Sequence, residues 1–544
     1  MSRKLAWPVL VALFTLRLAF GLCSDLYSED ETQIYLLGLR YHSTHAWPHF
    51  GADVVWTKSQ IPGALQALVV GVPLDVLPIP EAPYLLLDVL SMAALCLFAA
   101  YLCARLPTVP RWLIWIWLLT IPWTLNFSTH IMNPDYVLPA SLIFFIGFFE
   151  AMPPLAIGWM RAPLAFAAMG AAIAWIAQIH MSWPLLLPFA AMAFLWRLRG
   201  GGRAIAAPAG AFVAGLLTTG CVLLPTYFRF GLTLGSGSTG QNLHLHWREP
   251  ISTFVKTAAR ILSFASFETN RFVASGSGKQ IIVLFEHRWL VPLASLVALA
   301  GLAHPVWMAL TAFRRRSAAP HWPAVRWLAI GTVALVSLSF FVVMEPSQAR
   351  MYYIVAPVAF VYAAYCWTFV DSPAWRQVAA TVVAVNVLFQ AGLTIARFPG
   401  ASLYENRALL SQAIANRTPD IFSHRRAYAK DASPDDIAAV AASARAASDL
   451  EITNARVSRP IFNLTTWSLV IHNRSTTTAY RDLVCETTYY DSRDHELDRH
   501  DESVWMVIQP GESKTVEVID GVTWTPETVG ARPQIIAALA VDRR

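Results

Sequence analysis

The chain has 544 residues, of which 56% are hydrophobic and only 14% are charged, and its formal net charge is +6. Soluble proteins carry about 25% charged residues, so the composition excludes a chain that is soluble throughout. It indicates a polytopic membrane protein with room for one modest soluble domain. The positive charge does not indicate nucleic-acid binding, because much of it falls in short loops between apolar runs, where Lys and Arg set membrane topology.

Crossing a bilayer as a helix takes about 20 residues, and eleven apolar runs are predicted to do so. They lie near residues 5–22, 84–104, 112–129, 136–152, 163–180, 183–197, 206–228, 289–313, 326–344, 352–370 and 376–396. With the N-terminus inside, the short loops rich in Lys and Arg then fall on the inner side and alternate with the predicted outer segments, as the positive-inside rule requires. The alternation holds only if residues 61–79 do not cross. We therefore predict for them a helix lying in the membrane interface, broken by Pro73 and Pro78.

Two of the segments predicted to lie outside are long, residues 23–83 and 229–288. The first opens with three consecutive acidic residues, Glu29, Asp30 and Glu31, and also contains Lys58. Carboxylates at a membrane surface are costly to dehydrate, so they face water, a metal or a reacting group. The alternative is a solvated acidic loop. The second segment opens with GLTLGSGSTGQN, whose Gly and Ser residues indicate a mobile lid or a substrate loop.

The composition becomes polar near residue 398, and an odd number of spans puts the C-terminus outside. We predict a transmembrane domain over residues 1–397, a helical connector over 398–450 and a β-sandwich over 451–544. The runs WSLVIHN, LVCETTYY, VWMVI and IIAALAV alternate as half-buried strands do, and the PGES turn predicts a hairpin. The predicted fold class is a polytopic α-helical membrane protein of about eleven spans with a C-terminal all-β sandwich.

SEDETQIY, followed by WPHFGADVVWTKSQIPGAL, resembles the start of C-type (GT-C fold) glycosyltransferases. The pattern is most similar to the group of the bacterial lipid A aminoarabinose transferase and the protein O-mannosyltransferases. These proteins have an Asp-Glu pair after the first span, a Lys-x-x-Pro-like stretch and an Asp after the third span. The resemblance covers the organisation of roughly residues 1–400. It implies a polyprenyl-phosphate sugar as donor, and a bacterial inner-membrane protein with its active site and C-terminal domain facing the periplasm.

The same resemblance assigns roles to particular residues. Asp30, with Glu31 beside it, takes the place of the catalytic carboxylate, and Lys58 that of the lysine that contacts the donor phosphate. Asp135, in HIMNPDY, corresponds to a second acidic residue of the cavity. Arg350, in ARMYYIVAP, becomes a candidate phosphate clamp. The acceptor would be a glycan, a lipid or a protein.

Glycosyl transfer needs residues of these types. A base must take the proton of the acceptor hydroxyl. The phosphate leaving group is already a stable anion, so cations that hold its charge suffice and no acid is required. One carboxylate and one or two basic residues form a minimal set for direct displacement, which predicts inversion at the anomeric carbon.

Four candidates for substrate binding have simpler alternatives: Asp135, His180, Arg350 and Tyr352. Asp135 stands where a helix-capping Asp is common. His180, in AQIHMSW, is a substrate-contact candidate or an interfacial His. Arg350 is a phosphate clamp or a surface charge balanced by Glu345, and Tyr352 beside it fits an interfacial aromatic belt equally well. Arg17 lies inside the first span near its outer end, and we expect it to snorkel.

A divalent metal and its ligands are left open by the sequence. His244 and His246 would share one face of a strand and could hold a metal, completed by Glu249 or by an acidic residue such as Glu29. The alternative is a pair of interfacial His residues. The relative with a metal in this cavity has a Glu just before the Lys, where this chain has Thr57. No cofactor is assigned.

The sequence therefore predicts a membrane glycosyltransferase acting with lipid-linked sugar and membrane lipids as partners, and no nucleic acid. One alternative is a transporter or flippase for a lipid-linked glycan, which predicts charges deep within several spans and inverted repeats. Another is a non-catalytic membrane scaffold whose C-terminal domain binds partners.

Overall fold

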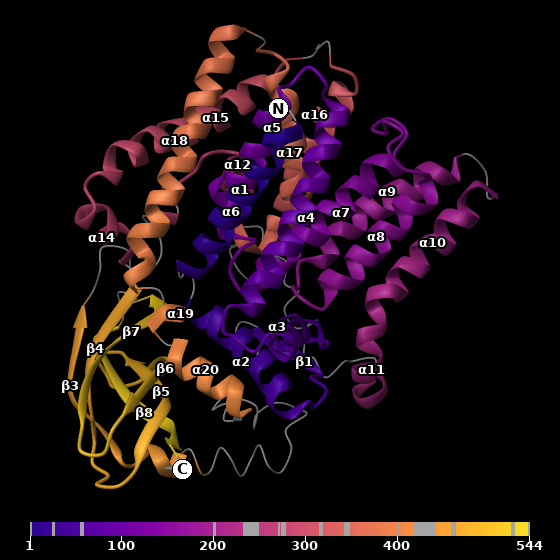
Figure 1. Cartoon of the computed structure of the whole chain (residues 1–544). Helices are drawn as coiled ribbons and strands as arrows, with labels where there is room; N and C mark the ends of the chain where they lie inside the picture. Colours follow the sequence, from indigo (N-terminus) through magenta and orange to yellow (C-terminus); the bar gives the residue numbers. More distant parts are fainter. Residues whose placement is uncertain are drawn as a thin grey trace.

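The structure, a computed structural model, describes residues 3–23, 28–54, 59–199, 203–231, 250–269, 272–273, 279–314, 319–341, 349–370, 372–400, 402–405, 407–417, 442, 444–458, 464–523 and 528–541. A bundle of helices occupies most of the chain, and a β-sandwich lies beside one end of the bundle (Figure 1). At the same end of the bundle, beside the sandwich, lies a layer of short elements, which we call the outer layer: α2 (Ser28–Thr44), β1 (Phe50–Val54), β2 (Ser59–Pro62) and α3 (Leu65–Val76).

Among the described residues, seven helices are long and apolar enough to cross a membrane. They are α4 (Ala82–Arg105), α7 (Asn133–Ala151), α10 with α11 (Ile205–Phe230), α15 (Leu290–Thr311), α16 (Trp322–Ser339), η5 with α17 (Ala349–Trp367) and α18 (Pro373–Arg397). Shorter apolar helices are α1 (Arg3–Cys23), α5 (Arg111–Thr120), α8 (Ala162–Ala177), and η2 with α9 (Trp183–Leu198). Every predicted span overlaps one of these helices, which confirms the polytopic helical fold, while the count of eleven crossings stays a prediction.

The predicted span at 112–129 is interrupted. α5 ends at Thr120, Ile121 is extended, and the short α6 (Pro122–Asn126) follows. A residue before proline avoids the helical region, which explains the break. The Thr120 carbonyl accepts a hydrogen bond of 2.8 Å from Asn386 Nδ2 of α18, so the backbone polar group at the break has a partner inside the bundle.

In the outer layer, α2 and α3 pack closely because small residues face each other. A Cβ on Gly38 would lie 2.3 Å from Val70 Cγ1, so only glycine permits this approach. A helix, α3, forms where the interfacial helix was predicted, but the expected break at Pro73 is absent; its position at the membrane interface stays a prediction. Pro73 lies in the last turn of α3, and the helix ends before Leu77, the residue that precedes Pro78.

The segment 229–288 differs from the predicted loop. Residues Pro250–Phe264 form α12 and Lys279–Glu286 form α14. Ile261 and Phe264 are buried in the core of the bundle, so this part of the segment is a packed helix rather than a mobile lid. The Gly/Ser-rich run of the prediction lies outside the described residues.

The C-terminal region forms two antiparallel sheets, as predicted. The strands are β3 (Leu450–Ser458), β4 (Leu464–Asn473), β5 (Ala479–Tyr490), β6 (Glu496–Ile508), β7 (Ser513–Thr523) and β8 (Gly530–Val541). One sheet has the order β3-β4-β7 and the other β6-β5-β8, with Leu469, Leu483 and Ile508 buried between them. The hairpin predicted at PGES is wrong, because β6 and β7 belong to different sheets. This turn crosses from one sheet to the other, and alternation alone does not reveal which strand pairs with which.

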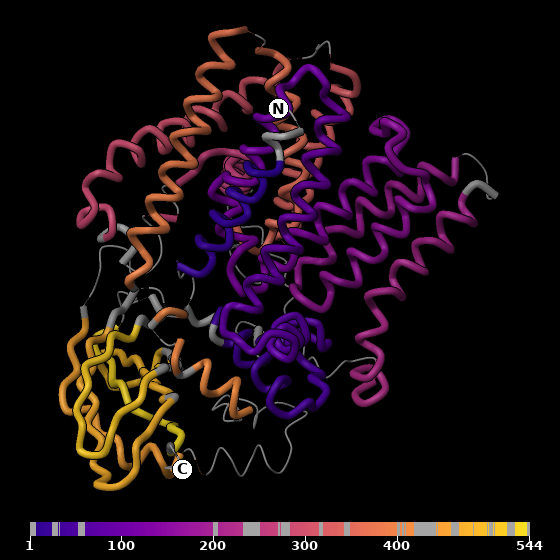
Figure 2. The backbone as a smooth tube through the Cα atoms, in the orientation of Figure 1, coloured from indigo at the N-terminus to yellow at the C-terminus, as the bar shows by residue number. Residues whose placement is uncertain are grey.

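The connector that leads to the sandwich begins with η6 (Phe398–Gly400), α19 (Ser402–Glu405) and α20 (Arg407–Asn416). α20 lies beside α2, as the backbone traces show (Figures 1 and 2). Its Ala413 and Ile414 are buried against Leu36 and Leu37 of α2. His42 Nε2 lies 3.0 Å from the Ile414 carbonyl, and its Nδ1 lies 2.8 Å from Asp75 Oδ1 of α3. The connector is therefore attached to the outer layer by both apolar and polar contacts.

Candidate functional site

The acidic residues Glu29, Asp30 and Glu31 occupy the first turn of α2, where the helix dipole favours negative charge. The side chains of Glu29 and Asp30 lie outside the described residues. The Glu31 side chain is buried, and its charge acts on the hydroxyl of Tyr136 in α7. The Glu31 side chain is thus packed close to the first turn of α7 rather than exposed to solvent.

Asp135 is the third residue of α7 and is fully buried. It is not the N-cap, which is Met132. Its Oδ1 instead accepts a hydrogen bond of 3.0 Å from the His130 amide in the preceding segment. Within the described residues, Asp135 Oδ2, Tyr136 Oη and Gln178 Oε1 are buried without a hydrogen-bond partner. A buried polar atom left unpaired costs about 1–3 kcal/mol, so these atoms mark where water or a substrate group would complete the bonding.

His180 follows α8 and lies close to Arg350, a candidate from η5 (Ala349–Val355). Burial, and then the positive charge of Arg350, lower the pKa of His180 to about 4. The Ser182 amide donates a hydrogen bond of 3.1 Å to His180 Nδ1, which requires that nitrogen to be unprotonated. The imidazole is therefore neutral at pH 7 and carries its proton on Nε2, which makes it a donor rather than a base.

Tyr352 and its neighbour Tyr353 are buried, not placed in an aromatic belt. The Tyr352 ring packs against Phe264, with 5.7 Å between ring centroids, and Tyr353 Oη donates a hydrogen bond of 3.1 Å to the Trp123 carbonyl. The aromatic-belt interpretation of Tyr352 is thus wrong, because α12 and the bundle cover its ring.

Gln66 in α3, which the sequence analysis did not single out, joins three parts of the site. Its Oε1 accepts a hydrogen bond of 2.7 Å from the Ala52 amide of β1. Its Nε2 donates to Asn133 Oδ1 at the start of α7 and, over 3.2 Å, to the Ile179 carbonyl beside His180. The available signal was a Gln within the apolar run IPGALQALVVGV, since a polar residue there has to be paired.

Lys58 lies outside the described residues, as do His244, His246 and Glu249. The strands on either side of residues 55–58 are described, and Val54 of β1 pairs with Ser59 of β2. β1 contacts both α2 and α3. Among the described residues, no group of three or more His, Cys, Asp or Glu side chains is arranged to hold a metal ion.

Two buried polar networks were also missed. Arg17 was expected to snorkel, but it is fully buried and its Nε lies 3.0 Å from Asp88 Oδ1 of α4. At the other end of α4, Arg105 Nη1 donates a hydrogen bond of 2.8 Å to Tyr101 Oη, which donates over 2.9 Å to Glu150 Oε1. Charges at these depths are stable only because partners from other helices are present, and one sequence does not identify such partners.

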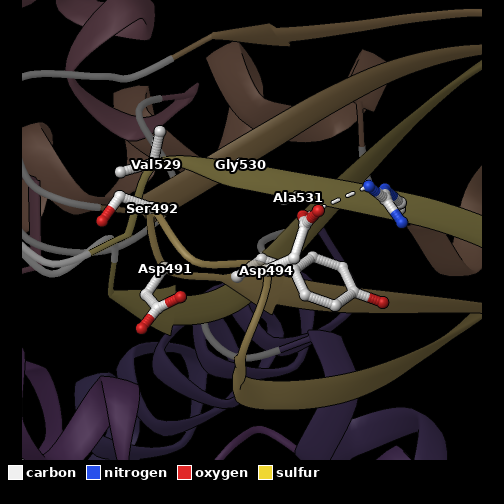
Figure 3. A pocket seen from close by; sticks show the side chains of 8 residues that line it. Asp491, Ser492, Asp494, Val529, Gly530 and Ala531 are labelled. Atoms are coloured by element: carbon white, nitrogen blue, oxygen red, sulfur yellow. Dashed lines mark hydrogen bonds and ion pairs between the residues drawn. The ribbon is translucent and has the colours of Figure 1, made fainter.

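The β-sandwich has a hollow of about 260 Å³ between the β5–β6 turn and the start of β8 (Figure 3). Asp494 Oδ1 lies 3.4 Å from Arg532 Nη2, and that guanidinium lies 4.9 Å from the centre of the Tyr490 ring. The Asp494–Arg532 pair neutralises itself in part, and the Asp491 carboxylate also lines the hollow.

No protein-family model matches the sequence, and no curated protein matches it either. Among solved structures, the chain is similar to ArnT from Cupriavidus metallidurans bound to undecaprenyl phosphate, with 12% identity, a TM-score of 0.43, and coverage of 78% of this chain and 80% of that chain. The apo state of the same protein gives 12% identity, a TM-score of 0.39, and coverage of 78% and 79%. ArnT is a lipid A aminoarabinose transferase with the GT-C fold, and so comes from the group that the N-terminal motifs resemble.

Proposed function

We propose that the chain is a membrane glycosyltransferase that moves a sugar from a polyprenyl-phosphate donor to an extracytoplasmic acceptor with inversion. One observation carries the proposal: carboxylates and a cation lie at the same end of the helical bundle, where the outer layer packs against it. Glu31 acts on Tyr136 beside the buried Asp135, and Arg350 acts on His180 close to the Gln66 contact. Direct displacement at an anomeric carbon needs this pairing of a base with a phosphate-holding cation.

In the proposed reaction, Asp30 accepts the proton of the acceptor hydroxyl. The acceptor oxygen forms the new bond to the anomeric carbon while the bond from that carbon to the phosphate oxygen breaks. The electron pair of the broken bond leaves with the polyprenyl phosphate, whose charge Lys58 and Arg350 hold. His180 donates a hydrogen bond from Nε2 to the sugar or the phosphate, because its other nitrogen is occupied by Ser182.

The transport alternative predicts charges within the spans, and the Arg17–Asp88 and Arg105–Tyr101–Glu150 networks are such charges. Each network includes hydrogen bonds that link different helices, such as Arg17 to Leu119 and Tyr101 to Glu150. A transport path needs side chains that exchange partners as the two halves move. The bonding therefore favours a rigid scaffold around a site over a moving path.

The test is a transfer assay in liposomes with synthetic polyprenyl-phosphate sugars. Wild type is compared with Asp30→Asn and Lys58→Ala, with Asp494→Asn in the exposed β5–β6 turn as the matched control. We expect transfer by wild type and by the control, a loss of about 100-fold or more in Asp30→Asn, and an inverted product. Equal turnover in all four proteins would reject the site, a retained configuration would overturn direct displacement, and lipid translocation without transfer would establish the transport alternative.

A further inference from the structure

Arg17 of α1 binds three other parts of the chain at once. Its Nε lies 3.0 Å from Asp88 Oδ1 of α4, its Nη1 donates a hydrogen bond of 3.1 Å to the Leu119 carbonyl of α5, and its Nη2 donates one of 2.8 Å to Ser128 Oγ. The side chain is fully buried. Because a guanidinium is planar and its donors point in fixed directions, these bonds fix both the height and the rotation of α1.

The next turn of α1 contacts the same segment. A Cβ on Gly21 would lie only 2.2 Å from the Thr129 carbonyl oxygen, so α1 approaches this backbone as closely as a glycine allows. The Phe20 ring meets the His130 ring edge-on at a centroid distance of 5.8 Å. Residues 17, 20 and 21 of α1 thus contact residues 128, 130 and 129, respectively.

The contacted segment leads directly to the candidate site. The His130 amide donates its hydrogen bond to Asp135 Oδ1, and the charge of Arg17 also acts on Asp135. On the other side, α1 ends at Cys23 and α2 begins at Ser28, so the acidic residues follow within a few positions. One set of contacts therefore connects the two carboxylate groups of the site.

We propose that Arg17 is a positioning residue that sets the separation between the acidic start of α2 and Asp135; this inference rests on the proposed transfer reaction. A buried ion pair adds little stability over an apolar contact of the same shape. Its use here is geometric. A base displaced by about 1 Å from the acceptor hydroxyl costs roughly 100-fold in turnover.

A purely structural role would make Arg17 equivalent to any other buried arginine of the bundle. The chain offers a matched control in Arg105, which is 2% exposed and hydrogen-bonded at the far end of α4. Gly21 also has a match in Gly215 of α10, where a Cβ would lie 2.0 Å from the Ala167 carbonyl oxygen. We expect both control substitutions to disturb packing to a similar extent, in other parts of the bundle.

The experiment compares Arg17→Met and Gly21→Ala with Arg105→Met and Gly215→Ala in the full-length protein in liposomes. We expect similar losses of thermal stability in both pairs. Only the first pair should lose about 100-fold in kcat, with KM for the lipid-linked donor changed less than about twofold. Arg17→Lys keeps the charge but not the fork of donors, so it should restore turnover only in part. An equal fall of kcat in both pairs, or full turnover in Arg17→Lys, would overturn the inference.

A second measurement does not need activity. Spin labels at the exposed positions Thr44 of α2 and Ile143 of α7 report the distance between the two helices. The distance distribution should shift or broaden in Arg17→Met and Gly21→Ala and stay unchanged in the controls. An unchanged distribution in all four variants refutes positioning by Arg17, whatever the reaction is. If the distribution shifts in Arg17→Met and Gly21→Ala but the wild-type protein transfers no sugar, only the proposed function is refuted.

Discussion

Replacement of Gln66 by Leu tests how the outer layer is attached to the bundle. Gln66 is fully buried, and its amide bonds the Ala52 amide, Asn133 Oδ1 and the Ile179 carbonyl. Leu fills a similar volume without a donor or an acceptor. The substitution therefore leaves these three groups buried without that partner while changing the packing little.

The expected loss follows from these bonds. A buried group left without its partner costs about 1–3 kcal/mol, and the contact to Ile179 is the longer one at 3.2 Å. We expect Gln66→Leu to lower the free energy of unfolding by about 3–5 kcal/mol. Turnover of the folded fraction should fall as well, because Ala52 belongs to the strand that leads into residues 55–58.

The assay combines thermal unfolding in detergent with transfer kinetics per folded protein. Gln390→Leu is the control. Gln390 in α18 is also buried, but its Nε2 makes a weaker contact of 3.4 Å with Asn386 Oδ1, so we expect a loss near 1 kcal/mol. Equal stability of the two variants, or undiminished turnover in Gln66→Leu, would refute the role assigned to Gln66.

Three further predictions concern other parts of the molecule. His180 has a folded pKa of about 4, so only the unfolded chain takes up its proton between pH 6.5 and 4, and stability falls as the pH is lowered. When the pH is lowered from 7 to 5, the free energy of unfolding of the wild type should fall by about 2 kcal/mol more than that of His180→Gln, as measured by thermal melts at the two pH values. Equal losses would contradict the lowered pKa of His180. Gly511 has φ +71 in the turn between β6 and β7, so Gly511→Ala should cost about 1 kcal/mol in denaturant titrations, and a neutral substitution would show that the turn adapts. Glu268 accepts a hydrogen bond of 3.0 Å from Trp123 Nε1 and forms an ion pair of 2.8 Å with Arg260. Glu268→Gln should therefore lower the free energy of unfolding by about 1–2 kcal/mol in thermal melts. An unchanged stability would mean that solvent screens the ion pair.

Local signals predicted much of the architecture. Runs of apolar residues are read directly as helices, because a helix satisfies its own backbone hydrogen bonds and needs no knowledge of its neighbours. The same holds for the alternation that predicted a β-rich C-terminal region. The breaks at Ile121 and Leu77 obey a local rule, since each residue precedes a proline, but only the break at Pro78 was predicted and residues 112–129 were expected to be one span.

Pairing between distant segments was not predictable in the same way. The turn at Pro510 was read as a hairpin, whereas the chain crosses to the other sheet there. Arg17 was expected to snorkel toward the membrane surface, because it lies near the outer end of the first predicted span. Its partner Asp88 lies 71 residues away on another helix.

The sequence by itself determined that the chain is a polytopic helical membrane protein with a β-rich end and an acidic cluster after its first span, because hydrophobicity, helix length and proline act locally. Only the tertiary structure decided that Glu31, Asp135, His180 and Arg350 lie at one end of the bundle. It also decided that Gln66 and Arg17 bind the neighbouring segments, at Ile179 and Ser128 respectively. Burial is the physical reason. A polar group inside a membrane protein has to find a partner, and which partner it finds depends on how whole helices pack.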